Sequence, residues 1–169
     1  GDVGVLRTWR AMCPELQERW PEAARPEHWE GVTMENGRVV QLKLEEFGLT
    51  GAVPAEIGRL SALRELDLDG NELTSVPAEI GQLTSLEKLY LGDNQLTSLP
   101  AEIGQLTSLR ELDLSGNRLT SVPAEIGQLT ALKQLNLSFN KLTRLPAAIR
   151  ELIAAGCHVV LDDGVRVDE

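Results

Sequence analysis

The chain contains 169 residues, of which 26 are acidic and 16 basic, so its net charge is −10 at pH 7. This length suits one domain that buries a continuous core, and the acidic balance argues against binding to a nucleic-acid backbone, which requires a basic face. No run of eighteen apolar residues is present, and the first residues lack the basic and apolar stretches of a secretory signal, so neither a membrane span nor a leader is expected.

Residues 1–38 predict a cap made of two short helices followed by a hairpin. Apolar residues recur at helical spacing in the first twenty residues, and Pro14 marks the start of the second helix. Asn36-Gly37 is typical of a two-residue hairpin turn. Because terminal repeats need a cap, we interpret the tryptophans as a cover for the open end of the core rather than as a ligand cage. The residues expected to face the core are Val5, Trp9, Met12, Leu16, Trp20 and Trp29.

Residues 39–155 consist of five repeated units. A fixed period of this length is typical of a solenoid of stacked supersecondary units. The first unit begins at Val39 and is one residue longer than the others. The predicted fold class is therefore α/β, with residues 1–169 forming a single domain. The later units begin 23 residues apart at Leu63, Leu86, Leu109 and Leu132.

The first half of each unit predicts a short strand followed by a bend. Leu66 and Leu68 alternate with charged residues, so the leucines face inward and the charges outward. An asparagine after the strand can satisfy the backbone groups of the bend, and stacked copies predict a buried ladder. Phe47 replaces this asparagine in the first unit, which predicts an apolar plug where the ladder begins. The ladder residues are Asn71, Asn94, Asn117 and Asn140.

The second half of each unit turns toward the outer face. Pro77 and its equivalents fix the turn, and the glycine in each middle AEIGQLT segment limits the helix to a turn or two of 3₁₀ type. The last unit lacks this glycine, which predicts an α-helix that begins at Pro146 and stops at Gly156. Residues 156–169 then predict a closing strand and tail, because Val159 and Leu161 repeat the inward strand positions.

The pattern L-x-x-L-x-L-x-x-N-x-L-x-x-L/V-P-x-x-I-x-x-L, which covers residues 39–161, resembles that of the leucine-rich repeat family. The resemblance implies a curved horseshoe with a parallel sheet on its concave side, short helical segments on its convex side, and protein recognition by the concave face. Residues 29–60 are similar to the N-terminal cap of plant-type leucine-rich repeats, through the motifs W-x-G-V, G-R-V and L-T-G-x-V/I-P-x-E-I-G. Extracellular caps of that type normally carry paired cysteines beside the tryptophan, and this chain has none there.

Comparison of the internal copies locates the variable surface. The outer segment PAEIGQLTSL is identical at residues 77–86 and 100–109, whereas the strand residues that face outward differ from copy to copy. Strand alternation places these residues on the concave face, which indicates a surface adapted to a partner. Neutral drift among exposed polar positions is the alternative. The predicted partner-binding residues are Lys43, Glu65, Asp67, Asp69, Lys88, Tyr90, Asp93, Glu111, Asp113, Gln134 and Asn136.

Tyr90 is the one aromatic residue at a strand position, and it lies in the middle of the array. An exposed central aromatic is a common hot-spot residue, although a solitary surface tyrosine is the alternative. The acidic residues around it predict attraction of a basic partner, or else a solvated face. Phe139 is expected to pack at the edge of the sheet.

Catalytic and metal chemistry find little support in the sequence. His28 and His158 lie near opposite ends of the chain, and no serine or cysteine has a base beside it. The pairs Asp67/Asp69 and Asp67/Asp113 could approach one another and bind calcium, but calcium usually takes six to eight oxygen ligands on a flexible loop. We therefore expect no catalytic residue, no cofactor and no metal.

The two cysteines, Cys13 and Cys157, are expected to be buried free thiols. Five strand spacings of about 4.8 Å separate them by about 24 Å along the array, whereas a disulfide requires Cα atoms within about 7 Å. Without a disulfide framework and without the cap cysteines, a cytoplasmic location is favoured.

The sequence therefore predicts a non-catalytic scaffold for protein–protein interaction. The expected partner is a protein or peptide with basic character, not a nucleic acid or a membrane, and the expected state is a monomer. Two alternatives remain open. One is a regulatory or structural module of a larger multidomain signalling protein, and the other is an extracellular receptor ectodomain that senses a peptide or glycan.

Overall fold

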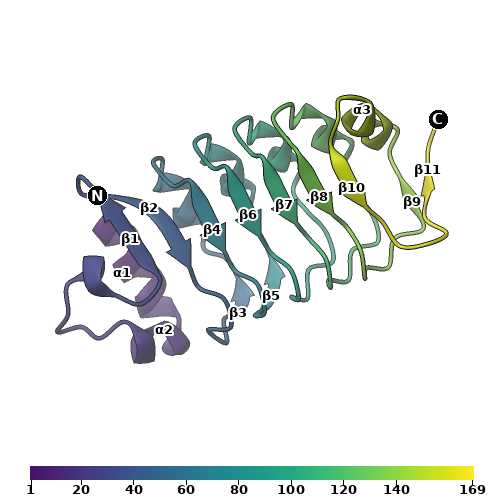
Figure 1. Cartoon of the computed structure of the whole chain (residues 1–169). Helices are drawn as coiled ribbons and strands as arrows, with labels where there is room; N and C mark the ends of the chain where they lie inside the picture. The colour runs from purple at the N-terminus through teal and green to yellow at the C-terminus, as the bar shows by residue number, and fades with distance from the viewer.

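A sheet of seven strands runs along one side of the molecule in the computed structural model, which describes residues 1–169 (Figure 1). The strand order is β1-β2-β4-β6-β7-β8-β10, and every neighbouring pair is parallel except β1 and β2. The parallel order follows from the repeat, because each unit returns the chain to the same edge before the next strand begins. The strands span Val32–Glu35 (β1), Arg38–Lys43 (β2), Glu65–Asp67 (β4), Lys88–Tyr90 (β6), Glu111–Asp113 (β7), Gln134–Asn136 (β8) and His158–Val160 (β10).

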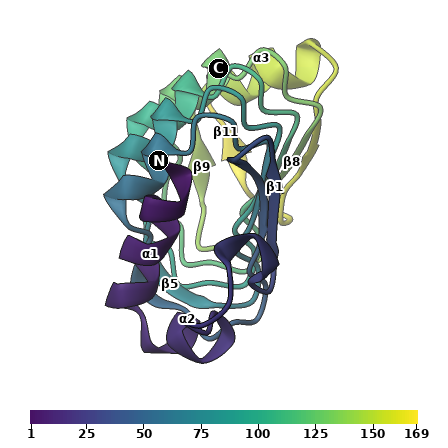
Figure 2. The same cartoon turned by 90° about the vertical axis from the view of Figure 1, so that its left-hand side faces the viewer.

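Short helices cover the side opposite the sheet (Figure 2). The turns of the three middle units are 3₁₀ helices, as predicted, and the turn of the first unit is one as well. The last is the predicted α-helix, which stops before Gly156 at φ 99°. The glycine in each turn allows close stacking, since a Cβ on Gly81 would lie 2.6 Å from the carbonyl oxygen of Glu102. The helices span Ala55–Arg59 (η2), Ala78–Gln82 (η3), Ala101–Gln105 (η4), Ala124–Gln128 (η5) and Ala148–Ala154 (α3).

Two small parallel pairs of strands join the sheet to the helical side. β3 (Thr50–Ala52) pairs with β5 (Glu72–Ser75), and β9 (Arg144–Leu145) pairs with β11 (Arg166–Val167). The second pair ties the C-terminal tail to the last repeat. The two ends of the solenoid are therefore each linked to the neighbouring repeat by a second strand pair in addition to the main sheet.

A single contiguous apolar core fills the space between the sheet and the helices. Leu66 and Leu68 are completely buried, and their outward neighbours Glu65 and Asp67 are only partly exposed. The predicted alternation of leucines and charges is confirmed. Because every repeat contributes the same inward positions, the leucines stack into continuous rows rather than into separate clusters.

The asparagine ladder joins each repeat to the one before it. Asn94 accepts a hydrogen bond at Oδ1 from the Leu73 amide (3.0 Å), and its Nδ2 donates to the carbonyl oxygens of Leu68 (3.0 Å) and Leu91 (3.1 Å). Leu91 belongs to the same repeat as Asn94, whereas Leu68 and Leu73 belong to the preceding one. Asn71, Asn117 and Asn140 repeat this arrangement. The predicted ladder is confirmed, and it connects repeats as well as the bend within each repeat.

The N-terminal cap closes one end of the core. It contains α1 (Asp2–Met12), α2 (Pro14–Arg19), η1 (Pro26–His28) and the β1–β2 hairpin. Asn36 and Gly37 both have positive φ, as the predicted hairpin turn requires. Trp9, Trp20 and Trp29 are at most 4% exposed, which confirms their predicted role as a cover. Met12 is 58% exposed instead of buried, because α1 ends at this residue.

Polar contacts and ring stacking hold the cap in place without a disulfide. Trp20 and Trp29 stack with their ring centroids 5.1 Å apart, and each indole N–H donates to a backbone carbonyl at 2.9 Å. The buried Asp2 carboxylate accepts hydrogen bonds from the Val39 amide (2.9 Å) and from Arg38 Nε (3.1 Å). Cys13 and Cys157 are buried free thiols, as expected.

Phe47 and the last strand occupy the two ends of the ladder. Phe47 is buried and lies under the Arg19 guanidinium, 4.4 Å from the ring centroid, so the predicted apolar plug is present. At the other end Val159 and Leu161 are only half-buried. The C-terminal end of the core is thus less completely covered than the N-terminal end.

We predict that Asn94→Ala destabilises the protein by about 2–4 kcal/mol. The change leaves the buried Leu73 amide without a partner, at a cost of about 1–3 kcal/mol. It also removes one of the two asparagine hydrogen bonds that the Leu68 and Leu91 carbonyls each accept, which costs about 1 kcal/mol more. Urea unfolding followed by circular dichroism measures the loss. Asn140→Ala is the matched control, because Asn140 makes the same contacts but is only half-buried. Equal losses for the two variants would contradict the argument from burial.

Candidate functional site

The outward-facing strand residues form two regular rows on the concave face, one made by the third residue of each repeat and one by the fifth. The third-position row runs Gln41, Glu65, Lys88, Glu111, Gln134 and His158. The fifth-position row runs Lys43, Asp67, Tyr90, Asp113, Asn136 and Val160. All predicted site residues of strands β2 to β8 therefore share one face.

Carboxylates gather around β4 and its neighbours on this face. Burial raises the pKa of Asp67, and the charges of Glu45 and Glu65 add to the effect. Burial raises the pKa of Asp69 to about 6, with further contributions from the charges of Asp67, Asp113 and Asp93. Carboxylates that resist ionisation beside one another favour a cationic partner, because such a partner removes the repulsion.

Asp69 reaches across to the next strand because Gly92 has no side chain. Asp69 Oδ1 accepts a hydrogen bond of 2.6 Å from the Gly92 amide, and a Cβ at Gly92 would lie 3.1 Å from the same oxygen. Asp113 instead folds back on its own strand, where its Oδ1 accepts from the Ser115 amide (2.9 Å) and hydroxyl (2.6 Å). The backbone thus fixes both carboxylates in place.

Tyr90 lies beside the acidic residues and is half-buried rather than freely exposed. Burial and, after it, the charge of the neighbouring Glu111 raise the pKa of its hydroxyl to about 12. Lys88 Nζ pairs with Glu111 Oε2 at 3.5 Å, which offsets part of the acidic charge. The hydroxyl of Tyr90 therefore stays protonated across the physiological range.

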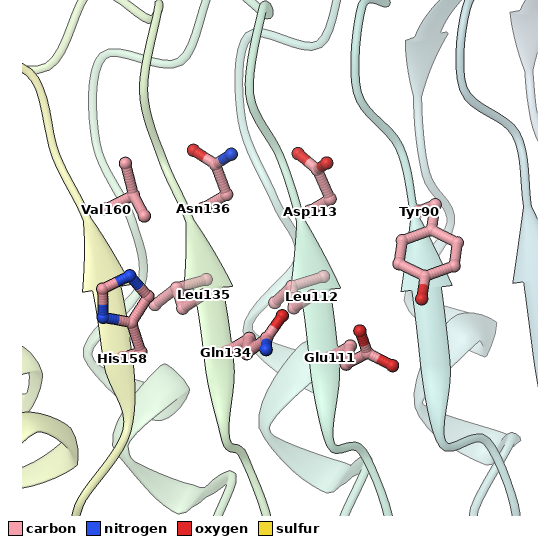
Figure 3. Close-up of a pocket in the computed structure, with 9 residues that line it drawn as sticks. All are labelled: Tyr90, Glu111, Leu112, Asp113, Gln134, Leu135, Asn136, His158 and Val160. Atoms are coloured by element: carbon pink, nitrogen blue, oxygen red, sulfur yellow. The ribbon is translucent and has the colours of Figure 1, made fainter.

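A hollow of about 140 Å³ opens next to Tyr90 (Figure 3). Tyr90 and Val160 stand at its two ends, and the short side chains of Asp113 and Asn136 lie between them. Four of the nine residues that line it were among those predicted from sequence on β7 and β8, and Tyr90 is a fifth. His158 and Val160 are outside the predicted set, although they pair in register with Gln134 and Asn136 and so extend the same two rows. The remaining residues that line the hollow are Leu112 and Leu135.

Two residues that follow the strands lie on the rim of this face. Asp93 and Phe139 both adopt positive φ (52° and 57°) in the bend after their strands, so Asp93 is not part of the strand rows. The expectation that Phe139 packs at the sheet edge is wrong, since 78% of it is exposed. The left-handed bend directs this residue away from the core. The Asp162 carboxylate holds the bend by accepting from the Phe139 amide at 2.9 Å.

The described residues contain no group of three His, Cys, Asp or Glu side chains placed to hold a metal ion. His28 lies in η1 and His158 in β10, at opposite ends of the array. None of the helices is both long and apolar enough to cross a membrane. The chemistry that the concave face offers is charge, hydrogen bonding and apolar contact.

A family model described as "Leucine-rich repeat region" matches residues 35–144. The chain belongs to the leucine-rich repeat family. The match covers β2 to β8, which carry most of the concave face. Domains of this family are generally non-catalytic.

Comparisons with individual proteins point to plant receptors. Leucine-rich repeat receptor protein kinase EMS1 from Arabidopsis thaliana is 43% identical over 61 residues, which cover 35% of this chain but only 5% of that protein. The solved ectodomain of the receptor kinase SOBIR1 from the same plant covers 99% of this chain and 96% of its own, with 27% identity and a TM-score of 0.80. The ectodomain of the plant membrane receptor kinase GASSHO1/SCHENGEN3 of A. thaliana, solved in complex with CASPARIAN STRIP INTEGRITY FACTOR 2, has 32% identity and a TM-score of 0.81 over 95% of this chain and 21% of its own.

These comparisons correct the expected location. A cytoplasmic location was favoured because the cap lacks paired cysteines, yet the matching domains of SOBIR1 and GASSHO1/SCHENGEN3 are ectodomains of receptor kinases. The physical reason for the error lies in the cap. The stacked tryptophans and the buried Asp2 hold the cap against the first repeat. Because the cap needs no disulfide, the absence of cysteines does not indicate in which compartment the protein works.

We predict that Asp69→Asn raises the melting temperature at pH 7 by about 2–4 °C, which corresponds to about 1 kcal/mol after allowance for solvent screening of a half-exposed group. The pKa of Asp69 is about 6 in the folded protein and 3.8 in the unfolded reference. The contribution of Asp69 to stability is therefore fully present below pH 3.8 and is lost as the pH rises through 6. Asparagine keeps the acceptor for the Gly92 amide but carries no charge.

Thermal unfolding of both proteins between pH 4 and pH 7.5 tests this prediction. The advantage of Asp69→Asn should shrink steadily as the pH falls toward 4. Asp163→Asn, which removes an exposed carboxylate from the tail, serves as the control and should change the melting temperature by less than about 1 °C. An advantage that is independent of pH would contradict the assigned cause.

Proposed function

We propose that this chain is a non-catalytic recognition domain whose concave face, centred on Tyr90, binds a protein or peptide of basic character. The observation that carries the proposal is the contrast between the two faces. The helical face repeats nearly the same residues in the middle units, whereas the strand rows change from copy to copy. A surface selected only for stacking has no reason to vary on the sheet side alone.

The physical state of the concave face supports a cationic partner. Asp67 and Asp69 lie close together, and both have raised pKa values. Residue 92 is a glycine, and any side chain there would crowd the Asp69 carboxylate. This arrangement costs stability in the free protein at neutral pH. A lysine or arginine of the partner would neutralise these carboxylates, so the free energy that their repulsion costs in the free protein would be recovered as binding affinity.

The receptor ectodomain is the wider setting that the comparisons favour. The solved GASSHO1/SCHENGEN3 ectodomain carries a bound factor, and SOBIR1 matches this chain over nearly its whole length. We therefore propose that this chain senses an extracellular protein or peptide ligand as a monomer. The matched segment spans about a twentieth of EMS1, so the activity of any larger protein is not part of the proposal.

We predict that Tyr90→Ala and the double variant Asp67→Lys/Asp113→Lys each reduce partner retention at least tenfold. Truncating a central aromatic removes a typical hot spot of 2 kcal/mol or more, and charge reversal repels a basic partner. Immobilised wild type and variants are incubated with an extract, and retained proteins are quantified by isotope-labelled mass spectrometry. Loss of the same proteins from both variants is the expected result.

Glu79→Lys/Glu102→Lys provides the matched control for the charge change. It makes the same two reversals on the helical face, in η3 and η4. Melting temperatures of all variants establish that each protein is folded. If every retained protein survives both concave-face variants, recognition does not take place on this face.

A further inference from the structure

Asn136-Leu137-Ser138 is the one stretch of this chain that matches N-x-S/T, the acceptor sequence for N-linked glycans. Asn136 is the last residue of β8 and faces the concave side. We infer that Asn136 is the acceptor for an N-linked glycan, which stands on the concave face beside the hollow. This inference rests on the extracellular setting in the proposed function, because such glycans are carried by secreted proteins.

The side-chain nitrogen of Asn136 is the atom to which a glycan is joined, and it has no partner in the folded chain. Asn136 Oδ1 accepts hydrogen bonds from the Ser138 amide (3.0 Å) and hydroxyl (2.6 Å), whereas Nδ2 donates to no group. No side-chain nitrogen or oxygen is both buried and unpaired, so Nδ2 faces solvent. A sugar joined to Nδ2 therefore breaks no contact of the folded protein.

The other asparagines lack this combination. Each of the four ladder residues uses Nδ2 to donate to backbone carbonyls of two repeats, so a sugar on that atom would break the ladder. Asn36 is exposed, but glycine and arginine follow it and no hydroxyl residue stands two positions on. Only Asn136 offers both the acceptor sequence and a free nitrogen.

The concave face leaves room for a bulky sugar at this position. The neighbours of Asn136 in the fifth-position row are Asp113 and Val160, which both have short side chains, and the hollow of about 140 Å³ opens beside them (Figure 3). Tyr90 stands two strand intervals from Asn136, or about 10 Å. The glycan therefore flanks the proposed contact with Tyr90 and does not replace it.

The transfer is a substitution at the first sugar. The donor is an oligosaccharide linked to a lipid through a pyrophosphate. Asn136 Nδ2 forms a bond to C1 of the sugar and loses one proton, while the bond between C1 and the pyrophosphate oxygen breaks. The lipid pyrophosphate leaves with the electron pair of that bond, so the step needs neither an oxidant nor a reductant.

Secretion of the full chain from insect cells behind a cleavable leader tests the inference. Trypsin cuts after Lys133 and Lys141, which places Asn136 in the peptide of residues 134–141. Release of the glycan by peptide-N-glycosidase in heavy-oxygen water should convert Asn136 to a labelled aspartate, located by tandem mass spectrometry. A sample without the enzyme corrects for spontaneous deamidation. Recovery of this peptide only with unlabelled asparagine overturns the inference.

Substitutions at the acceptor sequence show whether the glycan depends on it. Ser138→Ala should abolish the glycan, and Ser138→Thr, which keeps a hydroxyl, should retain it. Asn36→Gln, which changes an exposed asparagine outside the acceptor sequence, is the control and should leave the glycan in place. Melting temperatures establish that each variant is folded. A glycan that persists in Ser138→Ala overturns the assignment.

Asp113 provides a matched position on the neighbouring strand. Its Oδ1 accepts from the amide and hydroxyl of Ser115, as Asn136 Oδ1 accepts from Ser138. Asp113-Leu114-Ser115 differs from the acceptor sequence only in its carboxylate. Asn136→Gln/Asp113→Asn should therefore move the glycan to the tryptic peptide of residues 111–118. Absence of a glycan there contradicts the argument that this end of the strand admits a sugar.

The outcomes separate this inference from the proposed function. If Asn136 is unmodified in the secreted protein, the inference is overturned and recognition by the concave face stands. If Asn136 carries a glycan but every partner survives the concave-face variants, recognition is overturned and the acceptor site stands. Wild type and Asn136→Gln should retain the same partners. Partners that only Asn136→Gln retains would show that the sugar blocks Tyr90, which overturns its placement.

Discussion

Each ladder asparagine bonds backbone groups of its own repeat and of the repeat before it, and Asn71, Asn94 and Asn117 do so inside a core where water cannot replace them. Asn94, for example, serves the bend after β6 and at the same time holds two leucine backbones of the preceding unit. The leucine rows, the parallel sheet and the stacked 3₁₀ turns all require neighbouring repeats to stay in one register. The ladder enforces that register, because a slip of one residue leaves buried carbonyl and amide groups unpaired.

A solenoid held this way needs protection at its ends, and the two ends differ. The N-terminal cap closes the core with stacked indoles and a buried carboxylate, so it does without the disulfide that similar caps carry. The last strand leaves Val159 and Leu161 half-buried. The cap shows that the same structural task can be met by different chemistry, which is why the absence of cysteines misled the expectation about location.

The concave face is where this protein departs from what stability alone requires. Repeats with uniform polar strands would avoid the burial and mutual repulsion that raise the pKa values of Asp67 and Asp69. The same strands place a half-buried aromatic ring beside a hollow. Unfavourable interactions of this kind are typical of recognition sites, because a bound partner can neutralise the buried carboxylates whereas water cannot.

The sequence by itself determined the repeat, the alternation of leucines and charges, the 3₁₀ turns, the last helix and the register of both strand rows. These follow from local periodicity and from glycine and proline positions, which act within one unit. Only the tertiary structure decided the reach of Asn94 into the previous repeat, the exposure of Phe139, the shared carboxylate environment of Asp69 and Gly92, and the hollow that Val160 completes. Those features arise between residues about 23 positions or more apart in the chain, and they exist only once the repeats are stacked.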